Sequence, residues 1–282
     1  MYYSLEEAKN LVIEAGHRLL EEGLVARTWG NISARISEEE FVITPSGRGY
    51  EDLQPNDLVI VKVQDASYES DIKPSSEKIL HAACYRNRPD CSFIIHTHQF
   101  YATAISVSGE SYEFAPCAGY GFPGTEGLAQ QVEKTVKLYN EKDTFLMQRH
   151  GALMLGKDCE DAFDKATTLE TKSKEVFFSA LKNIEPSEDI SGYYSLAGVY
   201  GKIPAYIDDF TQILGPSVDG KKTVSEICSG VDAWAEEQIL YKNCASMLYA
   251  KAVDSKPMGF ADRCIQRIVY LTKYSKLKEK NK

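Results

Sequence analysis

The sequence has few of the features that mark membrane, secreted or nucleic-acid-binding proteins. No apolar run approaches the roughly 20 residues of a membrane-spanning helix, and the first residues lack the basic and apolar regions of a signal peptide. Lysine and arginine number 32 against 41 aspartates and glutamates, and the one lysine-rich stretch follows Tyr274. We therefore expect a soluble, cytoplasmic protein that binds neither membranes nor nucleic acid.

Paired cysteines and a dinucleotide-binding glycine motif are also missing. The seven cysteines are odd in number and include no Cys-x-x-Cys, which argues against a disulfide framework and against a zinc site of four thiolates. No Gly-x-Gly-x-x-Gly follows residue 215. The chain has 282 residues, 43% of them hydrophobic, so it can bury the core of one large domain or of a domain with an appendage.

Histidine is scarce, with five residues in the chain, and its placement is informative. His96 and His98 end an apolar run that is short enough for a buried strand, and residues i and i+2 of a strand point to the same face. A catalytic zinc site takes three protein ligands and leaves one position open. His150 follows another strand-like run and is the best candidate for the third ligand. Taken alone, a pair such as His96 and His98 is more often two satisfied polar residues at a strand edge than part of a metal site.

Patterns typical of helices and strands alternate over the first 180 residues. Ser4 and Glu7 have the spacing of a capping box, and the helix that they begin is expected to end near Glu22. The periodicity predicts strands at 28–35, 41–47, 58–63, 93–98, 144–148 and 152–155. It predicts further helices that open at 74–77 and span 101–107, 126–139, 158–181, 205–214, 232–252 and 260–277.

Several segments could bind an anion. The turns within 28–35 and 41–47 are rich in asparagine, serine and glycine, which form anion-binding nests, although these residues dominate ordinary turns as well. Ser75 or Ser76 can cap the next helix, whose N-terminus offers free N–H groups and a positive dipole end. The glycine-rich segment 117–125 lacks the lysine and spacing of a P-loop, so we interpret it as a structural loop near the site.

Glu77 stands in the first turn of this helix and has two interpretations. An acidic residue is favoured there by the helix dipole alone. It could instead serve as a functional carboxylate, with His81 one turn later to orient it, although an ordinary helical histidine is the simpler interpretation of His81.

Taken together, these motifs resemble those of the class II aldolase/adducin family, and most closely those of its fuculose-1-phosphate aldolase branch. The likeness covers about residues 5 to 180 and rests on motif order and approximate spacing. The motifs are Thr-x-Gly-Asn-Ile-Ser at 28–33, Ile-Thr-Pro-Ser-Gly at 43–47, Pro-Ser-Ser-Glu at 74–77, His-Thr-His at 96–98 and Arg-His-Gly at 149–151.

The resemblance implies an α/β fold. We expect residues 1–185 to form a three-layer α/β/α class II aldolase-like catalytic domain with a central, mainly antiparallel sheet. Residues 186–282 would form a linker and a mostly helical C-terminal extension that packs on this domain. The family further implies a fourfold-symmetric homotetramer with active sites between subunits.

The resemblance also implies the site. By carry-over of the motifs, His96, His98 and His150 would bind Zn2+ or another divalent transition metal. Glu77 would be the acid and base of the reaction, and a fourth ligand when the site is empty. The substrate phosphate would be held by Thr28, Gly30, Asn31, Ser46, Gly47, Ser75 and Ser76.

The implied activity is that of a lyase of carbohydrate metabolism. A metal-dependent aldehyde-lyase of this type cleaves a phosphorylated ketose to dihydroxyacetone phosphate and an aldehyde through a metal-stabilised enediolate. Glu77 would protonate C3, and a carboxyl near an apolar wall is expected to have a raised pKa that suits this role. A tyrosine would remove the C4 hydroxyl proton; the candidates are Tyr112, Tyr193, Tyr194 and Tyr200.

Other functions on the same scaffold remain alternatives. A sugar-phosphate dehydratase, a 4-epimerase or a decarboxylase would use similar motifs. Family epimerases generally carry aspartate where Glu77 stands, so the glutamate favours an aldolase and leaves the dehydratase open. An adducin-like binding protein would be marked by loss of the metal histidines, and all three are present.

Overall fold

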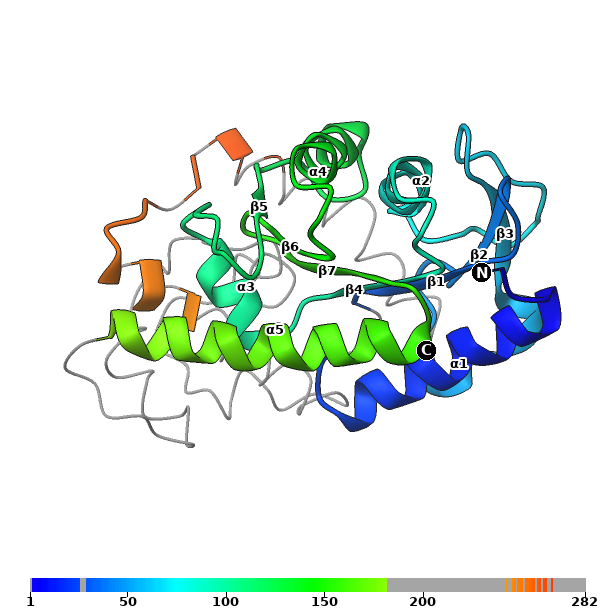
Figure 1. Cartoon of the computed structure of the whole chain (residues 1–282), viewed down its shortest axis with the longest axis horizontal. Helices are drawn as coiled ribbons and strands as arrows, with labels where there is room; N and C mark the ends of the chain where they lie inside the picture. The colour runs from blue at the N-terminus through cyan, green and yellow to red at the C-terminus, as the bar shows by residue number, and fades with distance from the viewer. Residues whose placement is uncertain are drawn as a thin grey trace.

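A computed structural model describes residues 2–25 and 29–181, together with 242, 245, 246, 248–250, 252–256, 258, 259, 261, 262 and 265. Helices cover both faces of one central sheet (Figure 1). Within the described residues, no helix combines the length and the apolar character that crossing a membrane requires.

Seven strands form the sheet in the order β3-β2-β1-β4-β7-β6-β5. Neighbouring strands are antiparallel, apart from the parallel pair β5 and β6, which confirms the expected mainly antiparallel sheet. The short β5 was not predicted, because two residues carry no readable periodicity. The bounds are β1 Asn31–Arg35, β2 Glu40–Ile43, β3 Val59–Lys62, β4 Phe93–Thr97, β5 Cys117–Ala118, β6 Thr144–Met147 and β7 Gly151–Gly156.

The helices complete the three layers. α1, α3 and α5 lie on one face of the sheet, and α2 and α4 cover the other (Figure 1). Each face buries its own hydrophobic cluster, as a sheet sandwiched between helices requires. The α/β/α arrangement expected from the sequence is therefore confirmed. The bounds are α1 Leu5–Glu21, α2 Lys78–Asn87, α3 Phe100–Ser106, α4 Glu126–Leu138 and α5 Cys159–Ala180.

Two helix starts follow the chemistry that the sequence predicts. At α1, the backbone N–H of Glu7 donates to Ser4 Oγ over 3.2 Å, which is half of the capping box. At α5, the N–H of Asp161 donates to the carboxylate of Asp158 over 2.8 Å. These local contacts fix where both helices begin.

The register of the three central strands brings their ends to one edge of the sheet. Asn31, which begins β1, is paired with His96 near the end of β4. Thr97, which ends β4, is paired with Ala152 near the start of β7. Because neighbouring strands run in opposite directions, the start of β1, the end of β4 and the start of β7 adjoin. His98 directly follows β4 and His150 directly precedes β7, so both lie at this edge.

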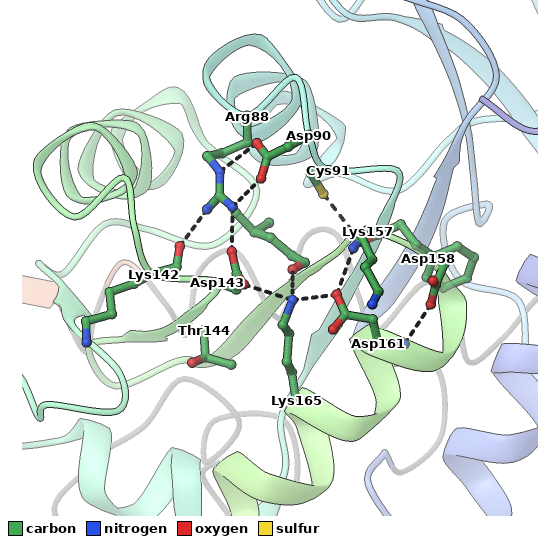
Figure 2. Close-up of polar contacts among 12 residues, drawn as sticks. Arg88, Asp90, Cys91, Lys142, Asp143, Thr144, Lys157, Asp158, Asp161 and Lys165 are labelled. Carbon is green, nitrogen blue, oxygen red and sulfur yellow. Dashed lines mark hydrogen bonds and ion pairs between the residues drawn. The ribbon is translucent and has the colours of Figure 1, made fainter. Parts of the chain in front are cut away.

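A network of ion pairs lies at the opposite end of β7, where Lys165 also donates to the carbonyl oxygen of Leu155 over 3.0 Å (Figure 2). The buried guanidinium of Arg88 contacts Asp90 at 2.7 Å and Asp143 at 2.5 Å. Lys165 on α5 joins the other oxygen of Asp143 at 2.9 Å to Asp161 at 2.5 Å. The network therefore links the end of α2, the start of β6 and the helix α5.

Replacing Arg88 with methionine should lower the free energy of unfolding by roughly 2 kcal/mol, because two carboxylates lose a buried guanidinium. Asp90 is 64% exposed, so solvent recovers part of the loss. Its hydrogen bonds to Arg88 lower the pKa of Asp90, so this contribution is present above about pH 4 and is lost as pH falls through the folded-state pKa. The difference between the unfolding curves of the two proteins should therefore be constant above about pH 4 and shrink as pH falls below it.

The matched control is Lys62→Met, which removes an exposed pair with Glu40. The unfolding curve of this variant should nearly coincide with that of the parent protein, because Lys62 is 50% exposed and solvent screens the pair. An Arg88→Met difference that stayed constant with pH would contradict the ion-pair account.

Described residues between 242 and 265 adjoin the domain near α3 (Figure 1). Ala245, Leu248, Tyr249 and Ala250 belong to the hydrophobic cluster under α1, α3 and α5. The Tyr249 ring stacks on Phe177 of α5 with ring centres 6.1 Å apart. The described residues from 242 to 252 are helical, in agreement with the helix predicted over 232–252, and 261, 262 and 265 are helical within the one predicted over 260–277. Residues 232–241 and the helix predicted over 205–214 lie outside the described residues.

Candidate metal centre

Three histidine side chains converge at the edge where β1, β4 and β7 meet. Nε2 of His96 lies 3.1 Å from Nε2 of His98. Candidate ligand atoms of His96, His98 and His150 all lie within 4.8 Å of one another. A tetrahedral centre with metal–nitrogen bonds of about 2.0–2.1 Å separates its nitrogen ligands by about 3.3 Å. Small side-chain rotations are therefore enough for these residues to hold one ion.

The hydrogen bonding of His96 favours metal binding. Its Nδ1 lies 2.8 Å from the carbonyl oxygen of Ala152, which can only accept, so Nδ1 carries the proton. In the neutral ring the lone pair is then on Nε2, the atom that faces the other histidines. A metal-binding histidine typically donates its second ring N–H in this way. Three imidazoles suit zinc and the neighbouring transition metals better than magnesium or calcium.

Two glycines allow the backbone to approach the histidines closely. Gly30 has a φ of +88°, and a Cβ there would lie 2.4 Å from the carbonyl oxygen of His96. A Cβ on Gly151 would lie 2.3 Å from the carbonyl oxygen of Thr97 and 3.2 Å from the His96 ring. A larger residue at either position would displace the strand that carries His96.

The Glu77 carboxylate points into the histidine cluster. Its Oε2 lies 3.1 Å from His96 Nε2, and its Oε1 lies 3.0 Å from His150 Nε2. Glu77 is the N-cap of α2, whose first residue is Lys78, and its side chain makes no cap. Ser75 Oγ instead accepts from the N–H of Glu77 over 3.2 Å. The helix thus begins later than predicted, so Glu77 precedes its first turn, and the carboxylate contacts the histidines and makes no cap.

The pKa of Glu77 shifts in the direction opposite to the one expected. Burial opposes ionisation of this carboxyl group, but its contacts with His96 and His150 hold the pKa well below its usual range. An apolar wall alone would have raised it. In this arrangement Glu77 is therefore ionised and can act as a proton acceptor.

A chain of buried hydrogen bonds through Asn31 also holds the Glu77 carboxylate. Asn31 Nδ2 donates to Glu77 Oε2 over 2.9 Å, and Asn31 Oδ1 lies 2.5 Å from Nε2 of His81. Burial lowers the pKa of His81 to about 3, so the ring is neutral and has one N–H. That N–H must face Asn31 Oδ1, which leaves Nδ1 to accept from Ser33 Oγ at 2.7 Å. His81 therefore orients the carboxylate indirectly, through the amide of Asn31.

Two segments that carry residues proposed for phosphate binding adjoin in the structure. An isolated antiparallel bridge joins Pro45 to Pro74. The N–H of Ser75 donates to the carbonyl oxygen of Thr44, and the N–H of Ser46 donates to that of Lys73, both over 2.9 Å. Gly124, in the glycine-rich loop, approaches the side chain of Ser76 closely enough that a Cβ would lie 2.9 Å from its Oγ. Gly30 and Asn31 adjoin the histidines instead, and Thr28 lies outside the described residues.

Sequence reasoning missed a lysine at this centre. Lys242 donates to the carbonyl oxygen of His98 over 3.1 Å, across 144 positions of the chain. No local pattern around Lys242 indicated this contact.

Among the tyrosine candidates, Tyr112 places its hydroxyl 2.6 Å from that of Tyr249, while Tyr193, Tyr194 and Tyr200 lie outside the described residues.

Comparisons with known proteins place this geometry in context. Residues 10–176 match the family model for the Class II Aldolase and Adducin N-terminal domain. A solved L-fuculose 1-phosphate aldolase is 28% identical with a TM-score of 0.55, and the match covers 64% of this chain and 89% of that one. The L-fuculose-1-phosphate aldolase of Thermus thermophilus is 26% identical with a TM-score of 0.52, and the match covers 63% of this chain and 97% of that one. YgbL of Klebsiella pneumoniae, for which aldolase, epimerase or decarboxylase activity has been suggested, shares the fold at 24% identity and a TM-score of 0.58; the match covers 65% of this chain and 94% of that one.

Proposed function

Because this chain belongs to the class II aldolase and adducin family, we propose that it is a metal-dependent aldolase that cleaves a phosphorylated ketose to dihydroxyacetone phosphate and an aldehyde. The observation that carries the proposal is the buried carboxylate of Glu77 within 3.1 Å of two of the three converging histidines. Two relatives at 26% and 28% identity, both L-fuculose 1-phosphate aldolases, support the same reaction class.

The histidines supply the proposed metal site. His96, His98 and His150 would hold a divalent transition metal, with zinc as the first candidate because all three ligands are imidazoles. When bound, the metal supplies positive charge opposite the negative charge that develops on substrate oxygens as the carbon–carbon bond breaks. Protein groups would transfer the protons and bind the phosphate.

Glu77 is the proposed proton carrier. In the condensation direction the ionised carboxylate would remove a proton from the hydroxymethyl carbon of dihydroxyacetone phosphate. In the cleavage direction the carboxyl group, once protonated by solvent, would return a proton to this carbon, C3 of the ketose, while a second base takes the proton of the C4 hydroxyl. Asn31 holds one carboxylate oxygen over 2.9 Å, which limits rotation of the side chain. A positioned base loses less entropy on reaching the reactive geometry.

The phosphate would be held by mostly neutral groups. Candidate donors are the backbone N–H of Gly47 and the hydroxyls of Ser46, Ser75 and Ser76, which lie on two segments joined by the bridge between Pro45 and Pro74. The amide of Asn31 is engaged by Glu77 and His81, so we propose that it positions Glu77 rather than only binding phosphate. Thr28 and Gly30 complete the proposed set.

Two organisational features are proposed on the same basis. The catalytic domain would end near residue 185, beyond the family match that ends at residue 176. The assembly would be a homotetramer of the family type. Light scattering of the purified protein measures the assembly directly, and a stable monomer would contradict this part of the proposal.

The decisive experiment measures metal content and proton exchange on the same preparation. Purified protein is analysed for zinc and other transition metals, then incubated with dihydroxyacetone phosphate in deuterated water and followed by NMR. We expect about one metal per chain and loss of one hydroxymethyl proton signal, abolished by a chelator and restored by zinc. This exchange needs no aldehyde partner, so the unidentified sugar does not prevent the test.

Two other outcomes separate the alternatives. Bound metal without exchange would contradict the aldolase and favour a dehydratase, 4-epimerase or decarboxylase. Absence of bound metal, even after incubation with zinc, would contradict a metal enzyme and favour an adducin-like binding protein.

A further inference from the structure

The least buried of the three histidines contacts the C-terminal part of the chain. His96 is fully buried and His150 is 3% exposed, whereas His98 is only partly buried. Lys242, itself 4% exposed, donates from Nζ to the carbonyl oxygen of His98 over 3.1 Å. The same ammonium lies 5.3 Å from the centre of the Trp29 ring. The Trp29 ring stacks on the His98 imidazole at 6.4 Å and 22°.

The segment after His98 is held from its other side by Glu170 of α5. One carboxylate oxygen accepts from the N–H of Tyr101 over 2.7 Å, and the other accepts from the N–H of Ala102 over 3.0 Å. Burial raises the pKa of the Glu170 carboxyl, and its hydrogen bonds and the positive charge of Lys242 offset part of this shift. Lys242 and Glu170 thus hold the carbonyl and the N–H ends of the same short segment.

Two more contacts join the C-terminal part to this region. Arg149, which precedes His150, donates from Nη2 to the carbonyl oxygen of Lys256 over 2.6 Å. Ser255 Oγ donates to the carbonyl oxygen of Val107, just after α3, over 3.2 Å. The backbone of Arg149 has a φ of +62°, a conformation that a non-glycine residue adopts at some cost. A side-chain contact there helps to hold the turn that presents His150.

We propose that Lys242 is a positioning residue of the metal centre: it fixes the backbone and the ring of His98, and so makes the C-terminal part of the chain a component of the site. This inference rests on the proposed function only for the presence of a metal on the three histidines. Lys242 lies 66 positions beyond the end of the family match at residue 176 (242 − 176), so the matched domain alone does not account for it.

The physical basis is the loss of freedom at His98. A ligand on a segment that follows a strand must give up backbone and ring rotations when it binds metal. The ammonium of Lys242 restricts the backbone carbonyl of His98, and the Trp29 ring restricts its imidazole, in the metal-free protein. A preorganised ligand binds more tightly because this ordering is already complete. The repulsion between an ammonium and a divalent cation acts in the opposite direction.

The test is the zinc affinity of the full-length protein, measured by competition with a chromophoric chelator. Lys242→Met should weaken zinc binding by about 10-fold, the lower end of what loss of an outer-shell partner costs. Lys242→Arg keeps a charged donor and should stay within about 3-fold of the parent protein. Circular dichroism and thermal unfolding of the metal-free variants verify that each one folds.

The matched control is Tyr249→Phe, which removes the hydroxyl contact with Tyr112 from the same part of the chain. It should lower the melting temperature and leave zinc affinity within about 2-fold, because Tyr249 does not contact a histidine of the site. Equal loss of zinc affinity in Tyr249→Phe and Lys242→Met would overturn the inference, because weaker packing of the C-terminal part on the domain would then explain both. Unchanged or tighter zinc binding by Lys242→Met would also overturn it.

The outcome is independent of the reaction. Zinc affinity is measured without substrate, so an inactive parent protein whose Lys242→Met variant binds zinc more weakly would support the positioning role and contradict the aldolase. An active parent with an unaffected Lys242→Met variant would support the aldolase and overturn the positioning role. The two conclusions can therefore fail separately.

Discussion

Replacing His98 with alanine should remove the bound metal and abolish proton exchange on dihydroxyacetone phosphate. One of three imidazoles is lost, and the remaining two cannot complete a catalytic site of three protein ligands. Metal affinity should fall by more than the roughly 10–100-fold that loss of an outer-shell partner costs. The measurement is metal content per chain after dialysis against a weak chelator, together with the exchange rate.

The fold should survive this substitution. His98 follows β4 rather than lying within it, and it is only partly buried, so alanine there leaves little cavity. The matched control is His17→Ala, an exposed position on α1, which should keep both metal and exchange. A His98→Ala protein with full metal content would remove His98 from the proposed ligands.

Replacing Glu77 with glutamine should leave metal bound but slow the exchange by about 100-fold to 10,000-fold, the usual contribution of a positioned acid or base. Glutamine has nearly the same shape, and its amide oxygen can still accept from Asn31 Nδ2. It cannot accept a proton from carbon at neutral pH. The measurement compares metal content and exchange rate with those of the parent protein.

A distant glutamate provides the control for this experiment. Glu14→Gln changes a residue of α1 far from the histidines and should leave the exchange rate unchanged. Normal exchange by Glu77→Gln would show that another group carries the proton. Loss of metal from Glu77→Gln would instead assign Glu77 a ligand role and leave the proton carrier unidentified.

Local patterns in the sequence were sufficient for most of the elements. Ser4 and Glu7 predicted the start of α1, and Asp158 is the N-cap of the predicted long helix α5. Each signal depends on residues three or four positions apart, which interact in the same way whatever the rest of the chain does. Elements without such a signal were missed, as the two-residue strand β5 shows.

The motifs also predicted which residues would gather, but not what each would contact. Asn31 was predicted to hold phosphate, yet its amide lies between Glu77 and His81. The pKa of Glu77 was expected to rise, but two histidines lower it. Both outcomes depend on the register of β1 against β4 and on where α2 starts, because a shift of one residue turns a side chain to the other face of the sheet.

The sequence by itself determined the candidate ligand types and the family, because imidazole and carboxylate chemistry and motif order are properties of the chain. Tertiary structure alone decided that His150 joins His96 and His98, that Asn31 holds Glu77, and that Lys242 holds His98. These contacts join residues 46 to 144 positions apart. Their geometry follows from strand pairing and helix packing over the whole domain, so no short stretch of sequence contains it.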